Sequence, residues 1–178
     1  MEPPASEADF YDTLAPQYDA FVNWESRLSV ELPFLERLLQ SVPHPGGDPA
    51  HVLDAAAGTG MHALALARRG YTLSAADLSP AMAEVARQNA ASAHLPLRFE
   101  VAGFAALAHT FGIDAADADA PRFDALLCLG NSLPHVSDAV SLAHALADFA
   151  ACLRPGGLLI LQNRNFDLVL AARQRWME

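Results

Sequence analysis

Glycines and carboxylates between residues 54 and 77 have the types and spacing that a nucleotide-like ligand requires. Gly58 and Gly60 follow a short apolar run, and residues without a Cβ let the backbone turn tightly and approach a ligand. Amides at the start of the helix that follows would face that ligand. Asp77 ends the next apolar run, where a carboxylate can accept hydrogen bonds from both hydroxyls of a ribose. The alternatives without a ligand are a tight structural turn at the glycines and, for Asp77, a surface aspartate that caps the next helix.

Two classes of cofactor fit this turn. Residues 58–63 match the pattern G-x-G-x-x-A, which can bind the pyrophosphate of a dinucleotide in an oxidoreductase. Asp54, however, precedes the first glycine at the end of the apolar run. A carboxylate there would repel a pyrophosphate and would suit a cationic group, such as the amine of an amino-acid-bearing nucleoside. This favours S-adenosylmethionine, which carries an ammonium, a sulfonium and a ribose but no phosphate.

Apolar runs that read as strands alternate with helical patterns along the chain, which predicts one α/β domain with a parallel sheet. We expect Pro16 to break any single helix within residues 9–24, and a loop over residues 42–49. A last element begins at residue 166 and runs to about 177. The expected strands are about 51–56, 71–76, 97–102, 123–129 and 158–162, and the main expected helices are about 26–40, 60–69, 80–93 and 142–153.

Ligands of parallel sheets lie beyond the carboxyl ends of the strands, so the polar residues that follow each strand should share one rim. Arg164 follows the last strand, and its guanidinium can take a carboxylate bidentately. Asn131 follows the fourth strand and can orient a small amine. The alternatives are an arginine on an exposed turn and a turn-forming asparagine next to Gly130.

Several motifs resemble one family. Residues 52–60 (VLDAAAGTG) and 76–82 (ADLSPAM) resemble the first two motifs of class I S-adenosylmethionine-dependent methyltransferases. Residues 127–135 (LCLGNSLPH), 153–167 (LRPGGLLILQNRNFD) and 25–27 (ESR) resemble the glycine/sarcosine N-methyltransferase branch. The resemblance covers roughly residues 9–170.

The resemblance implies a Rossmann-like, doubly wound parallel sheet of strand order 3-2-1-4-5, truncated after strand five. Residues 1–50 would form an N-terminal lid and helix, and residues 51–178 the S-adenosylmethionine-binding domain, together one compact unit. The family continues beyond strand five with elements that enclose the substrate. We therefore expect either a fragment of a longer product or a partner that supplies the rest.

Matching positions imply site residues. Ala56, Gly58 and Gly60 would line the methionine part of the cofactor, and Arg27 would pair with its carboxylate. Asn131 and Arg164 match substrate-binding positions. For His135 a packing role is the alternative, as it is for Tyr18 and Trp24 in the N-terminal segment. The residues expected to contact the cofactor are Tyr18, Arg27, Asp54, Ala56, Gly58, Gly60, Asp77, Leu78, Met82, Gly103, Phe104, Leu129 and His135.

The implied reaction is N-methylation of a small molecule, with glycine or a similar amino acid as the acceptor. An activated sulfonium needs a neutral amine held in line, so proximity and desolvation suffice and no general base is assigned. The alternatives are a nucleotide-dependent oxidoreductase and a truncated module that binds S-adenosylmethionine without turnover.

The composition of the chain excludes several classes of partner and reaction. The net charge of −10 argues against a nucleic-acid partner, and all eleven basic residues are arginines, so no lysine can form a Schiff base. Cys128 and Cys152 lie in apolar runs and are expected to be buried, reduced thiols rather than a disulfide or a metal site. No signal peptide is recognised and no apolar run approaches about 18 residues, which predicts a cytoplasmic protein without a membrane partner.

Overall fold

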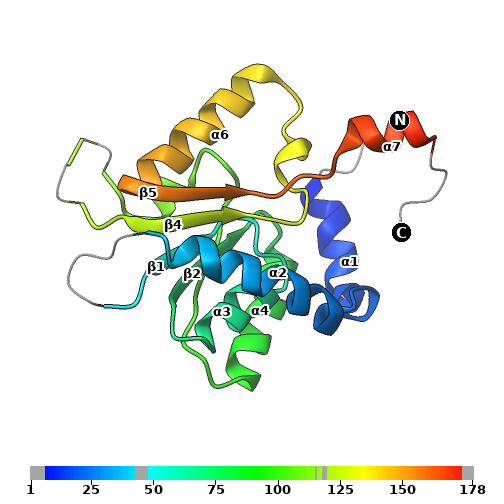
Figure 1. Ribbon diagram of the computed structural model, residues 1–178, viewed down its shortest axis with the longest axis horizontal. Coiled ribbons are helices and arrows are strands. Elements are labelled where there is room, and N and C mark those ends of the chain that lie inside the picture. Colours follow the sequence, from blue (N-terminus) through cyan, green and yellow to red (C-terminus); the bar gives the residue numbers. More distant parts are fainter. Residues whose placement is uncertain (1–6, 43–47, 115, 118–119, 174–178) are drawn as a thin grey trace.

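The fold was derived from a computed structural model, which describes residues 7–42, 48–114, 116–117 and 120–173. At its centre is a parallel sheet whose strands are ordered β3-β2-β1-β4-β5 (Figure 1), which confirms the expected class and strand order. The strands are β1 (His51–Asp54), β2 (Thr72–Asp77), β3 (Arg98–Val101), β4 (Phe123–Cys128) and β5 (Leu153–Leu161). The helices are α1 (Glu7–Phe21), α2 (Trp24–Leu39), α3 (Met61–Ala67), α4 (Pro80–Ser92), α5 (Leu107–Phe111), α6 (Ala139–Cys152) and α7 (Phe166–Ala172), with a short 3-10 helix at Leu133–His135.

The sheet is covered on both faces, and neighbouring residues of one strand point to opposite faces. Val52 packs in a cluster with the buried residues of α2, α3 and α4, whereas Leu53 packs in a second cluster with those of α5 and α6. Both strand residues are fully buried, as expected for a parallel sheet between helical layers. The helix α1 belongs to neither layer. It packs against α4 on the side toward which the strands run (Figure 1).

Local sequence signals explain where the helices next to the rim begin. The Ser79 side chain accepts a hydrogen bond from the Met82 amide, and Pro80 occupies the first position of α4, as predicted. The helix α6 begins in the same manner at Asp138, whose side chain accepts hydrogen bonds from the amides of Val140 and Ser141. Such caps fix the direction in which each helix leaves the carboxyl end of its strand.

The prediction that Pro16 breaks the N-terminal helix is wrong, because α1 continues through it. An interior proline costs about 3 kcal/mol. Here Pro16 lies on the exposed side of α1, while the preceding Ala15 is 1% exposed and the helix packs against α4. Tertiary contacts of α1 therefore offset the local cost, which an isolated sequence window does not reveal.

The last strand begins earlier in the structure than the sequence predicted. β5 begins at Leu153 rather than near Leu158, because Leu153 already pairs with Phe123. A register shift between Phe123 and Ala125 accommodates the proline and two glycines that read as a helix stop. The loop expected over 42–49 lies largely outside the described residues, and so does the end of the element expected to run to 177.

Both cysteines are buried and unbonded, as predicted. Burial raises the pKa of each thiol to about 12, with nearby carboxylates adding to the effect. In the described part of the chain, no cluster of three or more His, Cys, Asp or Glu side chains is arranged to hold a metal ion. Among its helices, none has the length and apolar character needed to cross a membrane.

Candidate functional site

A cavity of about 510 Å³ opens at the carboxyl ends of the strands, a size typical of small-molecule sites. Its walls come from the helices α1, α2, α3, α4 and α6 and from the segments that follow β1, β2, β3 and β4. Eleven of the thirteen residues expected to contact a cofactor line it, and Asp54 and Gly60 do not. The eleven are Tyr18, Arg27, Ala56, Gly58, Asp77, Leu78, Met82, Gly103, Phe104, Leu129 and His135.

The glycines of the first turn have different surroundings. Gly58 has a φ of +54°, and a Cβ built there would meet no atom within 4 Å, so the backbone itself forms the cavity wall. Gly60 has a φ of +80°, and a Cβ there would lie 3.1 Å from the Cβ of Ala86. Gly60 is thus required where the turn meets α4 rather than at the cavity wall.

Asp77, at the end of β2, is held by backbone amides on both of its oxygens. The Gly58 amide donates to Oδ2 at 2.7 Å, and the Ser79 amide donates to Oδ1 at 2.9 Å. Burial raises the pKa of Asp77, although these amides oppose the rise. Each carboxylate oxygen retains a lone pair for a further donor. The arrangement therefore suits a diol, while the side chain of Ser79, not of Asp77, caps α4.

Asp54 is behind the wall rather than on it. Its side chain is 1% exposed, and neither carboxyl oxygen has a hydrogen-bond partner among the described residues. Burial, reinforced by the charge of Asp77, raises its pKa to about 7. Asp54 does not line the cavity. Any influence on a ligand would act through its charge.

An apolar slot lies beside Asp77. It is formed by Leu78, Met82, Gly103 and Phe104, all of which line the cavity. A Cβ at Gly103 would come within 3.0 Å of the Leu78 side chain, so glycine keeps this slot open. Leu78 is half-exposed, so its side chain is accessible to an apolar group bound in the cavity.

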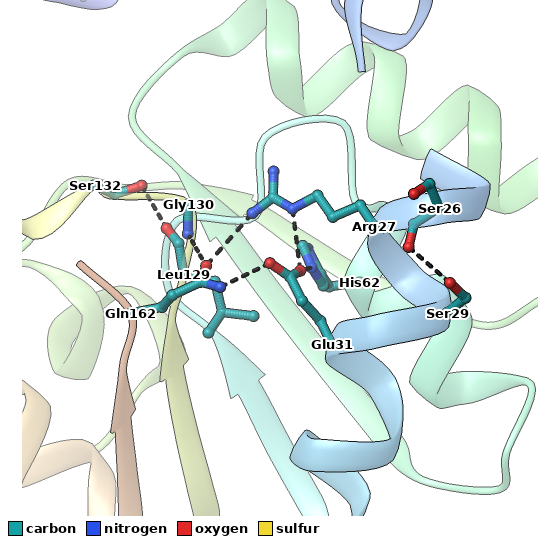
Figure 2. A network of polar contacts seen from close by, with 9 residues as sticks. All are labelled: Ser26, Arg27, Ser29, Glu31, His62, Leu129, Gly130, Ser132 and Gln162. Atoms are coloured by element: carbon teal, nitrogen blue, oxygen red, sulfur yellow. Dashed lines mark hydrogen bonds and ion pairs between the residues drawn. The ribbon is translucent and has the colours of Figure 1, made fainter. Parts of the chain in front are cut away.

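Arg27 of α2 also lines the cavity, and it is the only arginine or lysine among the lining residues. Its Nε donates to Glu31 Oε2 at 3.0 Å, and its guanidinium lies 5.3 Å from the ring centre of Trp24. Figure 2 shows Arg27, Glu31, His62 and Gln162 in one network of polar contacts. The cavity lining therefore contains both a guanidinium that can bind an anion and a carboxylate that can accept from hydroxyls.

The helix α1 closes the cavity with aromatic side chains. Tyr11 and Tyr18 both line it, and burial raises the pKa of the Tyr18 hydroxyl. The Tyr11 hydroxyl and His135 Nε2 are 3.0 Å apart, which joins α1 to the segment after β4. In that segment the Ser132 hydroxyl donates to the Leu129 carbonyl at 2.9 Å.

Two carboxylates that hold α1 in place were missed in the sequence. Asp12 accepts hydrogen bonds from the Ser79 hydroxyl and from the Ala81 amide at the start of α4. Asp19 accepts from Thr59, in the turn after β1, at 2.6 Å, and also from Trp24 Nε1 and Asn89. The available signal was the recurrence of acids on an aromatic-rich segment, which alone does not name their distant partners.

Asn131 and Arg164 lie outside the cavity lining. The Arg164 amide donates to Asn131 Oδ1 at 3.0 Å, so the two predicted substrate residues adjoin each other. Asn131 has a φ of +67° and directly follows Gly130, which does line the cavity. The structure thus brings the pair together at the edge of the cavity, and their predicted role remains a prediction.

Charge and shape together define what the cavity fits. Asp77 can receive a diol, the slot around Leu78 can cover a flat ring, and Arg27 can receive a carboxylate. A nucleoside that carries an amino acid has all three groups. A pyrophosphate fits less well, because the Gly58 amide that would bind it already donates to the Asp77 carboxylate.

Comparison with known proteins gives a consistent result. Residues 52–157 match the family described as "Methyltransferase domain". The chain is 32% identical over 164 residues to the glycine/sarcosine N-methyltransferase of Parasynechococcus marenigrum (strain WH8102), and 32% identical over 162 residues to that of Aphanothece halophytica. These alignments cover 92% and 91% of this chain but 54% and 56% of the relatives, so the chain spans about half the length of the curated relatives it matches.

A solved structure shows the same fold at lower sequence identity. The SAM-bound amino pentose methyltransferase CalS10 from Micromonospora echinaspora superposes with a TM-score of 0.58 and 22% identity. The match covers 92% of this chain and 59% of that one. This similarity is evidence for the fold alone.

Proposed function

Because the chain belongs to the class I S-adenosylmethionine-dependent methyltransferases, we propose that its rim cavity binds S-adenosylmethionine and serves transfer of the methyl group to a small amino-acid amine such as glycine. The observation that carries the proposal is the position of Asp77, held by two backbone amides on a cavity that Arg27 also lines. Relatives named glycine/sarcosine N-methyltransferases support the choice of acceptor.

In this proposal each part of the cavity receives one part of the cofactor. The Asp77 carboxylate accepts from the ribose hydroxyls, and Leu78, Met82 and Phe104 cover the adenine. The turn at Gly58 and the Arg27 guanidinium hold the amino-acid portion. When bound, the cofactor would supply an electrophilic methyl group to the lone pair of the acceptor nitrogen, and its sulfur would retain the electron pair of the C–S bond as a neutral thioether.

The contribution of the chain to such a reaction is orientation and exclusion of water. Tyr11 and Tyr18 cover the cavity from α1, and the carboxylates of Asp12 and Asp19 hold that helix down. We assign no general base, because a neutral amine needs only alignment and desolvation. In this proposal α1 and α2 serve as a lid and helix on the cofactor-binding unit that begins at β1.

We place the acceptor at the edge of the cavity next to Gly130. There Asn131 would orient the amine and Arg164 would take the carboxylate. The contact between the Arg164 amide and Asn131 Oδ1 supports a shared subsite, since it leaves the guanidinium out of that contact. The acceptor role rests on fewer contacts than the cofactor role.

Isothermal titration calorimetry with S-adenosylmethionine tests the cofactor assignment. We expect saturable binding by the wild-type chain, with NADH in parallel giving none. Absence of S-adenosylmethionine binding at millimolar ligand would refute the proposal. NADH binding in place of S-adenosylmethionine would restore the oxidoreductase interpretation.

A product assay with glycine, sarcosine and an unrelated amine tests the acceptor. Methylated glycine from the wild-type chain, and its loss in Arg164→Ala with cofactor binding retained, is the expected result. Cofactor binding without turnover of any amine would identify a binding module instead. Full activity of Arg164→Ala on glycine would refute the carboxylate role.

A further inference from the structure

Resting on the proposed cofactor, we propose that Glu31 is a positioning residue that holds the Arg27 guanidinium ready for the carboxylate of S-adenosylmethionine. Glu31 does not line the cofactor cavity, whereas Arg27 does. Glu31 contacts two lining residues, Arg27 and His62, and of these Arg27 carries the charge that a carboxylate ligand would meet.

The contacts of Arg27 leave part of its guanidinium available. Nε donates to Glu31 Oε2 at 3.0 Å, and Nη2 approaches Gln162 Oε1 at 3.5 Å. Nη1 has no hydrogen bond or ion pair to the described residues, and Figure 2 shows it pointing away from Glu31. A guanidinium held through Nε presents its outer edge for a bidentate contact with a carboxylate.

The Glu31 carboxylate is itself fixed from three directions. His62 Nε2 donates to Oε2 at 2.6 Å, and Gln162 Nε2 donates to Oε1 at 2.7 Å, in addition to the contact with Arg27. Burial alone would raise the pKa of Glu31, but these donors outweigh it and leave the pKa lowered. The carboxylate is therefore an anion at neutral pH, and its orientation is determined by groups on other elements.

Those groups belong to elements that shape the cavity. His62 is in α3, directly after the glycine turn, and Gln162 immediately follows β5. Gln162 Oε1 also accepts from the Gly130 amide at 2.9 Å, so the network reaches the segment after β4. Glu31 thus sets the guanidinium relative to the turn and to the segment near which the acceptor is proposed to bind.

The small contribution expected from the Arg27–Glu31 ion pair to the free energy of folding suggests that the pair has a role other than stability. The side chains of Arg27 and Glu31 are 24% and 19% exposed, and a partly buried ion pair adds little to folding, because the cost of removing its charges from water offsets their attraction. Restricting a long, flexible side chain before binding, by contrast, reduces the entropy lost when the ligand arrives. The network is better suited to preorganisation than to stability.

The test compares two ligands that differ at one end. S-adenosylmethionine has the amino-acid portion, whereas 5′-methylthioadenosine has the same adenosine without it. We expect Glu31→Gln to weaken binding of S-adenosylmethionine about tenfold and to leave binding of 5′-methylthioadenosine within about twofold. Glu36→Gln is the matched control, since it removes the same charge from α2 at a residue paired with the surface Arg69.

A second pair of variants, made in a protein that lacks the Arg27 guanidinium, tests whether Glu31 acts through Arg27 or through the packing of the chain. In Arg27→Met, S-adenosylmethionine should lose its advantage over 5′-methylthioadenosine, and adding Glu31→Gln should have no further effect. If Glu31→Gln does not fold, as judged by circular dichroism, Glu31→Asp should show the same ligand selectivity, because it keeps the charge but withdraws the carboxylate from Arg27.

Three results would overturn the inference: equal loss of both ligands in Glu31→Gln, unchanged binding of S-adenosylmethionine, or a tenfold loss also in Glu36→Gln. Each leaves the proposed function intact, because the wild type still binds the cofactor. A wild type that binds no S-adenosylmethionine overturns the proposed function and this inference with it.

Discussion

Asp54 should make the stability of the ligand-free protein depend on pH in a defined direction. Its buried carboxyl has no hydrogen-bond partner among the described residues, and burial together with Asp77 raises its pKa from 3.8 to about 7. A raised pKa means that the folded state favours the protonated form. The stabilising contribution is therefore fully present below the unfolded pKa near 3.8 and is lost as pH rises through about 7.

The shift in the pKa of Asp54 determines how much the free energy of unfolding should change with pH. Two states that differ in pKa from 3.8 to about 7 differ by about 4 kcal/mol over the full titration, of which about 3 kcal/mol falls between pH 5 and pH 9. Asp54→Asn keeps the size of the side chain but cannot ionise. The wild type should therefore lose about 3 kcal/mol relative to Asp54→Asn over this interval.

Urea unfolding at pH 5, 7 and 9 measures this difference directly. Comparing the two proteins cancels the contributions of other groups with shifted pKa values, such as His51 and His62, whose pKa values are lowered chiefly by burial. Asp48→Asn, at an exposed position, is the control for removal of one charge and should follow the wild type. Parallel curves for wild type and Asp54→Asn would refute the assignment of a raised pKa to Asp54. Carboxyl carbon chemical shifts of the wild type give an independent titration if the variant does not fold.

Four further predictions follow from other residues of the structure. Asp77→Asn should weaken S-adenosylmethionine and 5′-methylthioadenosine alike, by about tenfold or more in calorimetry, and selective loss of one ligand would contradict the ribose assignment. Gly60→Ala should destabilise the chain by about 1–3 kcal/mol in urea unfolding, since its φ is +80° and its Cβ would crowd Ala86 at 3.1 Å; an unchanged midpoint would disprove this. Phe149→Ala should cost about 3–5 kcal/mol, because the ring is fully buried under α6, and a cost below 1 kcal/mol would show that it is not. Cys128 and Cys152 should resist a thiol reagent at pH 8 in the native protein and react in urea, because the pKa of each is about 12; rapid native labelling would contradict their burial.

Features that depend on neighbouring residues were predictable from the sequence. The start of α4 at Ser79 and Pro80 requires only the local preference of a cap and a first-turn proline. The turn at Gly58 and the carboxylate at Asp77 are likewise set by the order strand, glycine, helix, strand. The alternation of strands and helices is enough to give the parallel sheet, and the motif resemblance supplied its order.

Features that depend on packing between elements far apart in the chain were not predictable from the sequence. The continuation of α1 through Pro16 depends on α4, which lies far along the chain. In α6 the helical pattern was evident, but Leu146 is exposed while the buried stripe runs through Ala145 and Phe149. A hydrophobic pattern identifies a helix more reliably than it identifies which of its apolar residues reach the core.

The same contrast applies inside the site, and it explains which acids the sequence revealed. Asp77 was recognised because it ends a strand next to the glycine turn. Asp12, Asp19 and Glu31 were not, because the partners of each include groups on other elements: Ser79 for Asp12, Thr59 for Asp19, and His62 and Gln162 for Glu31.

These carboxylates have a common physical role. Turns at the carboxyl ends of strands expose amides, hydroxyls and ring nitrogens that need acceptors, and each acid supplies one from the N-terminal helices. Asp12, Asp19 and Glu31 therefore fix the walls of the cavity, while Asp77 alone among the lining residues offers a carboxylate to the ligand. Neutralising a wall acid should accordingly alter how well a ligand is held without removing a group that touches it, and this is the difference that the paired-ligand experiment on Glu31 measures.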